Sequence, residues 1–273
     1  MRESENVFKT QAAMHSLQDE VKMTGRESVD EFFNRNAEGY ARSTSHARGN
    51  DLAIMISRLG PSKKMKALDV ATGTGFTAIE LSGYVDEVFA TDRTRGMLDQ
   101  AKKLSEERGI ARMHFIMSDS TALPFSDAYF DIVTCRRAAH HFRNKDIFLA
   151  EVHRCLASEG FLAIVDMVAP EGFKDMYNSL ERARDSSHEE AETFNGWKRL
   201  VESNGFELTS ADLEEERVSF DKWLYPVNVD TDGGRNSRRL LSESDKPFRE
   251  SISYDAGSDA FVKRRMVAIA RRS

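Results

Sequence analysis

A glycine turn that follows an aspartate is the clearest chemical feature of this chain. The stretch Lys66–Thr77 runs from apolar residues through Asp69 into a turn that contains Gly73 and Gly75. Glycine has no Cβ and readily adopts positive φ angles, so the backbone of such a turn can approach a flat ligand closely. A strand, a glycine turn and a helix in this order hold nucleoside-containing cofactors at the carboxyl ends of the strands in open α/β sheets. The stretch therefore predicts a binding site for such a cofactor.

Two further aspartates occur where the next strands of such a sheet should end. Asp92 follows the segment Val88–Thr91, and a carboxylate there can accept hydrogen bonds from both hydroxyls of a ribose. Asp119 and Ser120 follow the next apolar segment and suit an exocyclic adenine amine. Together these positions predict contacts to the two halves of an adenosine group.

The glycine turn taken alone leaves a dinucleotide cofactor open. The spacing from Gly73 to Ala78 satisfies the loose dinucleotide fingerprint, and Asp92 lies at about the distance expected of a ribose-binding acid. Two details favour another cofactor. Asp69 lies near the end of the first strand, where dinucleotide sites usually carry an apolar residue. The strand–turn–helix unit also begins only at Lys66, whereas many dinucleotide-binding domains start with it.

A pair of histidines, His140 and His141, follows the predicted strand Phe130–Thr134. A histidine with a pKa near neutrality could accept a proton from a substrate hydroxyl, amine or activated carbon. The alternatives are structural: one histidine could cap the helix Lys145–Leu156, and the other could pack in the core. No metal site is expected, because the spacing of these histidines and Cys135 is not that of metal ligands.

The elements that must position these residues alternate along the chain. Apolar segments predict strands at Lys66–Val70, Glu87–Thr91, Met113–Met117, Phe130–Thr134 and Gly160–Met167. Helices are expected between them at Phe76–Gly83, Arg95–Arg108, a short piece after Ser120, and Lys145–Leu156. This alternation indicates a parallel sheet wound on both faces.

Both ends of the chain add to this unit. Helical spacing is present at Val29–Tyr40 and Asp51–Leu59, and residues 171–204 are expected to be helical, with a solvated charged run at Glu181–Glu192 and a helix at Thr193–Ser203. Long strands are predicted at Gly205–Phe220 and Ala260–Arg271, with an excursion at Trp223–Phe248 between them.

Composition excludes several classes of protein. The 273 residues carry a net charge of −6, which does not favour a nucleic-acid partner. No apolar run approaches the roughly 20 residues of a membrane span, and the polar first residues are unlike a signal peptide. Two cysteines make no disulfide framework and suit a reducing compartment. We therefore expect a cytoplasmic protein.

In the region from about residue 66 to residue 169, the chain resembles the class I S-adenosylmethionine (SAM)-dependent methyltransferases. It is most similar to the small-molecule branch that includes the ubiquinone and menaquinone C-methyltransferases. The segments that carry the resemblance, in order, are Leu68–Gly75, Asp92 with Met97-Leu98, Asp119-Ser120 through Leu123-Pro124-Phe125, Phe130–Val133, Ala138–Phe142 and Leu156–Phe161. Ala71 stands where the family more often has its first glycine, and Arg136-Arg137 bring more charge than is usual there.

The resemblance implies roles for individual residues. The implied cofactor contacts are Asp69, Ala71, Thr72, Gly73, Gly75, Asp92, Arg93, Met97, Asp119, Ser120, Cys135, Arg136 and Tyr40. The stretch Ser45–Asp51 falls where relatives contact the methionine carboxylate. His140 and His141 are the candidates for a catalytic role, although methyl transfer from a sulfonium needs mainly positioning and no obligatory base.

The resemblance also implies an architecture: a doubly wound, mostly parallel seven-stranded sheet of order 3-2-1-4-5-7-6 with the last strand antiparallel. Residues 1–60 would form a helical lid and residues 61–273 the SAM-binding domain, with substrate-side insertions at about 170–200 and 223–258. Aromatic residues of the C-terminal half could line the acceptor or pack the insertions onto the sheet; they are Phe173, Tyr177, Trp197, Trp223 and Tyr225.

The expected function is methyl transfer from SAM to a small molecule, such as a phenol, sterol, polyketide or amine. Three alternatives remain open. They are an NAD-type oxidoreductase on a similar sheet, a SAM-binding module without turnover, and a methyltransferase that acts on RNA or protein. The sequence determines neither the acceptor nor the oligomeric state.

Overall fold

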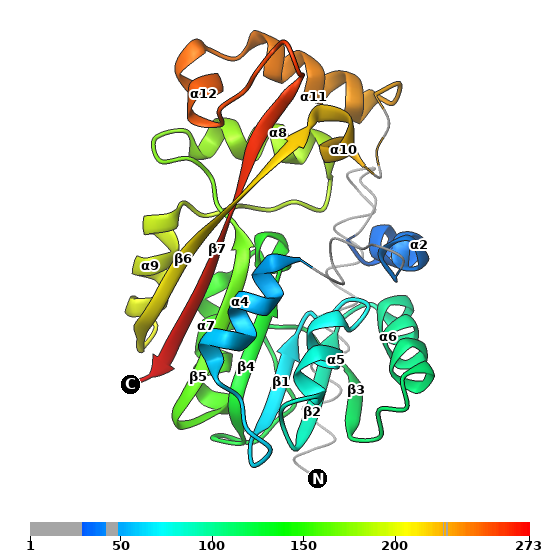
Figure 1. Ribbon diagram of the computed structural model, residues 1–273, viewed down its shortest axis with the longest axis vertical. Coiled ribbons are helices and arrows are strands. Elements are labelled where there is room, and N and C mark those ends of the chain that lie inside the picture. Colours follow the sequence, from blue (N-terminus) through cyan, green and yellow to red (C-terminus); the bar gives the residue numbers. More distant parts are fainter. Residues whose placement is uncertain (1–28, 42–48, 226, 228) are drawn as a thin grey trace.

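A seven-stranded sheet forms the centre of the computed structural model, which describes residues 29–41, 49–225, 227 and 229–273 (Figure 1). The strands are β1 (Lys66–Val70), β2 (Glu87–Asp92), β3 (Met113–Met117), β4 (Phe130–Arg136), β5 (Leu156–Met167), β6 (Phe206–Ser219) and β7 (Ala260–Arg272). Their order is β3-β2-β1-β4-β5-β7-β6. Strands β1 to β5 pair in parallel, and β7 runs antiparallel to both β5 and β6. The predicted order and the antiparallel last strand are confirmed.

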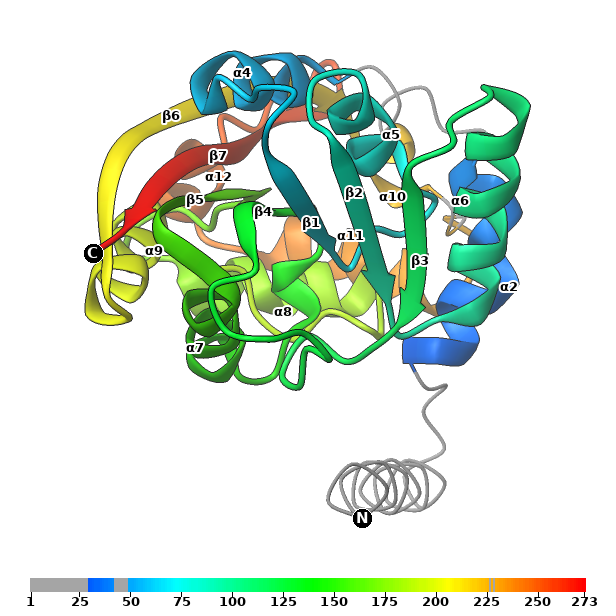
Figure 2. The same ribbon diagram turned by 90° about the horizontal axis from the view of Figure 1, so that it is seen from below.

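Helices cover both faces of this sheet (Figure 2). One face packs on α4 (Asn50–Leu59) and α5 (Phe76–Ser82), and the other on α7 (Lys145–Cys155) and α9 (Phe194–Ser203). The strands bury apolar side chains toward both layers, as sheets covered on both faces do. Strand β1 shows this directly, since Ala67 belongs to the first core and Leu68 to the second.

Two helices lie at the β3 edge of the sheet. Helix α6 (Arg95–Glu107) packs against β2 and β3, and α2 (Val29–Ala41) lies beside α6 (Figures 1 and 2). The Gly96 N–H donates a hydrogen bond to Asn34 Oδ1 at 2.8 Å, which joins the two helices. Helix α2 thus reaches the first turn of α6, immediately after the end of β2.

A third apolar cluster lies beyond the carboxyl end of the parallel strands. It is built on the long strands β6 and β7, which extend past the rest of the sheet and carry a helical layer (Figure 1). The helices of this layer are α8 (Lys174–Arg184), α10 (Phe220–Leu224), α11 (Asp232–Glu243) and α12 (Lys246–Ser251). Its core holds Tyr177, Phe220, Trp223, Phe248 and Phe261. This layer stands over the end of the sheet where the glycine turn opens.

The structure corrects several details that the sequence predicts. Strand β4 continues to Arg136, and β5 already begins at Leu156 with a register shift opposite Phe130. No helix follows Ser120; a single turn forms instead, closed by the Ala122 N–H on the Asp119 carbonyl at 3.2 Å. The helical region expected over 171–204 is interrupted between α8 and α9.

A further correction concerns the charged run Glu181–Glu192. It was expected to be solvated, and this is wrong for several of its residues, because Glu181, Asp185, Ser187 and His188 are all buried. They are buried because polar partners from distant segments meet them. The Trp223 indole donates to Glu181 at 3.1 Å, for example.

No helix in the described ranges is long and apolar enough to span a bilayer.

Candidate cofactor and acceptor site

The turn after β1 has the backbone conformation that its glycines suggest. Gly73 and Gly75 have φ angles of 55° and 84°, and Ala71 also lies in the left-handed region with φ 53°. A Cβ on Gly75 would come within 2.8 Å of the Ala101 Cβ, so this glycine allows the turn to press against α6. A Cβ on Gly73 would meet no atom within 4 Å. Gly75 therefore positions the turn, while Gly73 faces open space.

Asp92 at the end of β2 clamps this turn. Its Oδ2 accepts a hydrogen bond from the Gly73 N–H at 2.8 Å, and its Oδ1 accepts one from the Thr94 N–H at 2.9 Å. The side chain is therefore held in one orientation beside the open space over Gly73. Because a carboxylate can accept about four hydrogen bonds, these contacts leave it able to accept from a ligand as well.

Asp69 is buried beneath the same turn. Its two carboxylate oxygens accept hydrogen bonds from the hydroxyls of Thr72 and Thr134, each at 2.6 Å. Burial raises the pKa of Asp69 to about 6, although both hydroxyl contacts act to lower it. The Asp69 side chain links the turn to β1 and β4. A cationic group of a ligand would stabilise its ionised form.

The ends of β2 and β3 are also joined. Asp119 Oδ1 accepts hydrogen bonds from the Thr121 N–H and hydroxyl at 2.8 and 2.7 Å, and Arg93 Nη1 lies 3.8 Å from Asp119 Oδ2. Met97 is buried on the first turn of α6, and Ser120 is half-buried. These residues surround the strand ends next to the glycine turn, as the sequence predicts.

Strand β4 ends in a buried ion cluster. Arg136 Nη2 lies 2.8 Å from Asp51 Oδ1, and Arg137 Nε lies 2.8 Å from Asp51 Oδ2. Burial acts to raise the pKa of Asp51, but Arg137 and Arg136 outweigh it and hold that pKa at about 2. The sequence places Asp51 only in a stretch near the cofactor, and nothing local shows that it pairs with two arginines. The neighbouring Cys135 is fully buried, and burial raises the pKa of its thiol.

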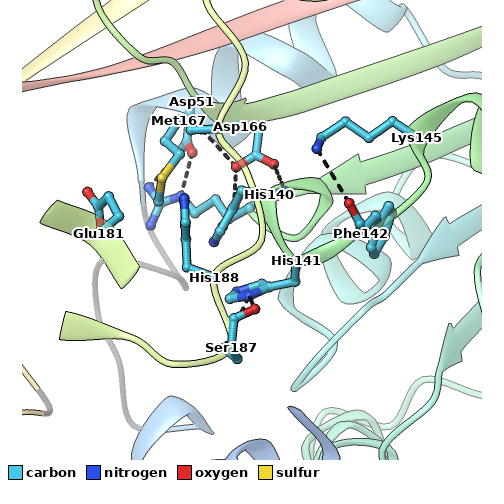
Figure 3. Close-up of polar contacts among 12 residues, drawn as sticks. Asp51, His140, His141, Phe142, Lys145, Asp166, Met167, Glu181, Ser187 and His188 are labelled. Atoms are coloured by element: carbon cyan, nitrogen blue, oxygen red, sulfur yellow. Dashed lines mark hydrogen bonds and ion pairs between the residues drawn. The ribbon is translucent and has the colours of Figure 1, made fainter. Parts of the chain in front are cut away.

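His140 and Asp166 form a buried hydrogen-bonded pair at the ends of β4 and β5 (Figure 3). His140 Nδ1 lies 2.6 Å from Asp166 Oδ1, and the His140 backbone N–H donates to Asp166 Oδ2 at 2.8 Å. Burial favours a raised pKa for Asp166, but His140 and the Met167 N–H outweigh it, so the pKa of Asp166 is lowered. Because an ionised carboxylate only accepts, Nδ1 carries a proton, and Nε2 is the ring nitrogen that Asp166 does not engage.

Two more imidazoles lie against His140 (Figure 3). The ring centroids of His141 and His188 are 4.0 and 5.5 Å from that of His140. His141 Nδ1 lies 2.9 Å from the Ser187 carbonyl oxygen, and His188 Nε2 lies 2.6 Å from Asn178 Oδ1. Burial, with a smaller effect of His140, lowers the pKa of His141 to about 4 and that of His188 to about 3. Both rings are therefore neutral at neutral pH.

Neither member of the histidine pair caps α7, because Asn144 Oδ1 accepts from the Ile147 N–H at 3.0 Å and so occupies the capping position. His188 was missed by sequence reasoning, since it lies in the run that was expected to be solvated. The charged residues around His188 in the sequence do not distinguish a buried position from an exposed one.

Some of the expected site residues pack elsewhere in the protein, and others lie outside the residues that the structure describes. The side chain of Tyr40 and residues 42–48, hence His46 as well, fall outside the described residues. Trp197 packs in the core beneath the sheet, and Tyr177 and Trp223 pack in the third cluster, which supports the packing alternative for these three. Tyr225 is exposed.

Comparison with known proteins identifies the fold family. A family model described as "Methyltransferase domain" matches residues 68–164. An uncharacterized methyltransferase of Bacillus subtilis, YcgJ, is 34% identical over 201 residues, which cover 73% of this chain and 76% of that protein. A demethylmenaquinone methyltransferase of Bacteroides fragilis is 32% identical over 123 residues, which cover 43% of this chain and about half, 49%, of that enzyme.

Solved structures agree. The crystal structure of YcgJ superimposes with a TM-score of 0.78 at 26% identity, and that of a putative methyltransferase from Bacillus halodurans with a TM-score of 0.77 at 32% identity. Each alignment covers 82% of this chain and 99% of the other. This chain belongs to the class I SAM-dependent methyltransferases, and its methyl donor is SAM.

Proposed function

We propose that this protein methylates a small-molecule acceptor, with the cofactor bound over the glycine turn and the acceptor beside His140. The observation that carries the proposal is the Asp92 clamp on the Gly73 N–H next to the open space over Gly73. This arrangement lies one strand away from the His140–Asp166 pair, because β1 and β4 are neighbours in the sheet. Donor and acceptor sites would then adjoin at one edge.

The residues present fit SAM. The space over Gly73 admits the methionine part, and the buried Asp69 would stabilise its positive charge through the turn. Asp92 would accept from the ribose hydroxyls, and Asp119 with Ser120 would meet the adenine edge. The remaining contacts that we assign to the cofactor are Ala71, Thr72, Gly75, Arg93, Met97, Cys135, Arg136 and Tyr40.

When bound, the cofactor would supply a methyl group on a sulfonium, ready for displacement by the acceptor. The chain itself has to hold donor and acceptor at attack distance and exclude water, and positioning of this kind can supply roughly 7–11 kcal/mol of the barrier. His140 Nε2 would accept the proton that a hydroxyl, amine or activated carbon loses during transfer. His141, neutral and held by Ser187, would support the His140 ring.

Three further observations support a small acceptor in the interior. The net charge of −6 disfavours nucleic acid, some relatives are named for demethylmenaquinone, and the layer of α8, α10, α11 and α12 stands over the site. We assign residues 1–60 to a lid and the insertions at about 170–200 and 223–258 to the acceptor side. Two free buried cysteines are in keeping with action in the cytoplasm.

Titration of the full chain with S-adenosylhomocysteine (SAH) and, separately, with NADH tests the cofactor site. We expect SAH to bind and NADH not to bind; binding of NADH alone would contradict the proposal. Mass spectrometry of a metabolite extract incubated with the protein, with and without SAM, tests turnover. A product heavier by one methylene group that appears only with SAM supports the enzyme, whereas SAH binding without any such product favours a binding module.

A further inference from the structure

A group of cations lies on the acceptor side of the candidate site, and neither the cofactor nor the His140–Asp166 pair accounts for it. Arg137 follows β4, and Lys263 and Arg265 lie near the start of β7. Side chains two residues apart on a strand share a face, so Lys263 and Arg265 point to the same side of the sheet. Because β5 separates β4 from β7, the backbone of Arg137 lies about 10 Å from that of Arg265.

The backbone of Arg137 is held in an uncommon conformation. Its φ of 56° lies in the left-handed region, which few residues other than glycine adopt, and its N–H donates to the Val165 carbonyl at 2.6 Å. Such conformations occur preferentially at ligand sites, where the surroundings enforce them. Here the chain turns away from the line of β4 at Arg137, and the Arg137 side chain contacts Asp51.

Lys263 differs from the neighbouring arginines in its contacts. Asp51 is shared by Arg136 and Arg137, Glu216 pairs with Arg265, and Glu181 pairs with Arg184. Lys263 makes no hydrogen bond or ion pair with any residue of the described ranges. Lys263 is half-buried. Burial lowers the pKa of Lys263 to about 8, with Arg184, Arg265 and Arg137 adding to the lowering, although the charge of Glu181 acts to raise it.

Lys263 therefore brings into a partly desolvated region an ammonium group with which no carboxylate of the described residues pairs. An unpaired charge in such surroundings is costly, so a stable protein retains one there for a reason other than packing. An anionic ligand would balance it. Guanidinium groups match carboxylate and phosphate geometry, and an ammonium group adds a flexible point charge.

We propose that Arg137, Lys263 and Arg265 bind an anionic group, a carboxylate or a phosphate, of the methyl acceptor. This inference rests on the proposed function, because it assumes that a methyl acceptor binds beside His140. The position of the cations favours the acceptor over the cofactor. The glycine turn follows β1, which lies three strand spacings from β7, or about 14 Å along the sheet. Asp166 ends β5 between them, so an acceptor held at β7 would present its reacting atom near His140.

The experiment uses the full chain, saturated with SAH, and small probes of matched shape. Benzoate and phenyl phosphate are the anionic probes, and benzamide is the neutral one; binding is measured by calorimetry. We expect the wild type to bind at least one anionic probe more tightly than benzamide, and Lys263→Met to weaken that binding about tenfold or more, as loss of a charged hydrogen bond does. Lys263→Arg should retain it.

Arg271→Met is the matched control, because Arg271 is an exposed cation at the opposite end of the same strand, paired with Glu159 and Glu207. This variant should bind the probes as the wild type does. The Lys263→Met variant should unfold at the same temperature as the wild type or a higher one, since it removes an ammonium group without an ion pair. Its affinity for SAH should stay within about twofold, because the cofactor lies elsewhere.

The inference is overturned if no anionic probe binds the wild type, or if Lys263→Met binds it equally well. A large loss of SAH affinity in Lys263→Met would also overturn it, because the cations would then serve the cofactor. Failure of the proposed function has a different signature, namely no SAH binding by the wild type, or SAH binding without any methylated product from the extract. The probes are titrated without SAH as well, so anion binding is judged in either case.

Discussion

Single side chains at the strand ends do most to shape the proposed donor site, and Asp92 is foremost among them. One carboxylate fixes the Gly73 N–H and the Thr94 N–H at once, so it determines where the glycine turn stands relative to α6. A helix cap alone would explain the contact to Thr94 but not the contact to Gly73, which is 19 residues away in sequence. The geometry therefore favours a shared role in shaping the turn and binding ribose.

We expect Asp92→Asn to weaken SAH binding about 10- to 100-fold, because a neutral amide replaces an acceptor whose charged hydrogen bonds are worth roughly 1.5–3 kcal/mol each. Calorimetric titration of the folded variant checks this. Asp99→Asn, an exposed position on α6, is the control and should bind SAH as the wild type does. If the Asp92→Asn variant bound SAH with unchanged affinity, Asp92 would not be a cofactor-binding residue.

The second residue-scale prediction concerns His140. Replacement by Gln keeps a polar side chain but loses the proton acceptor, so we expect kcat to fall about 10²- to 10⁴-fold while SAH affinity is retained. Asp166→Asn should lower kcat as well, since an amide no longer enforces the proton on Nδ1. Turnover of the acceptor found by mass spectrometry is the measurement.

His114→Gln serves as the control for that prediction. His114 is an exposed histidine on β3 that pairs with Glu87, far from the end of β4, and its replacement should leave kcat unchanged. Wild-type turnover by His140→Gln would show that transfer needs positioning alone.

At the scale of elements, one carboxylate links helix α4 to the end of β4. Asp51 stands in the first turn of α4 and binds two arginines that are 85 and 86 residues away. Helix α4 also carries an exposed ion pair, between Arg58 and Asp212 of β6. The two contacts offer a direct comparison of a buried and an exposed salt bridge on one helix.

We expect Asp51→Asn to lower the free energy of unfolding by about 3–5 kcal/mol, because it leaves two buried guanidinium groups without their anion. Asp212→Asn should cost at most about 1 kcal/mol, as exposed pairs do. Urea unfolding at neutral pH measures both. Equal effects of the two substitutions would mean that the Asp51 cluster is hydrated rather than buried.

The contribution of Asp51 also depends on pH. Its pKa is about 2 in the folded chain, against about 3.9 in an unfolded one. The unfolded chain therefore takes up a proton first on acidification, and the stabilisation is present above about pH 4 and disappears as the pH falls toward 2.

At the scale of the whole molecule, buried polar groups join the sheet to the helical layer above it. His141 and His188 lie between these parts and have pKa values of about 4 and about 3 when folded, below the value of about 6.5 in an unfolded chain. Between those values the unfolded chain binds protons that the folded chain does not. Asp69, with a raised pKa of about 6, acts in the opposite direction, but it is one group against two.

We therefore expect the free energy of unfolding to fall as the pH drops from about 6.5 toward about 4.5. Urea unfolding at several pH values checks this. His188→Gln removes one of the two groups and should make the fall shallower than in the wild type. A His188→Gln protein with the slope of the wild type would show that His188 is accessible to protons in the folded state.

Much of the fold follows from local patterns. Strand periodicity predicted the alternation of strands and helices, and the family resemblance implied the sheet order, which the structure confirms. The prediction of a short helix after Ser120 was wrong, because the Asp119 side chain accepts a hydrogen bond from the Thr121 N–H and closes a turn instead. The start of β5 was misplaced because Leu156 pairs with Phe130 across a register shift that no local pattern shows.

By itself, the sequence predicted the donor side of the proposed site, since a glycine turn and the acids after consecutive strands must meet at one edge of a parallel sheet. Only the tertiary structure revealed the features that we assign to the acceptor side: the Asp51 cluster, the His140–Asp166 pair, the burial of His188 and the cations of β7. The physical reason is that a charged side chain looks the same in sequence whether it meets water or a distant partner. Which of the two it meets depends on the packing of elements far apart along the chain.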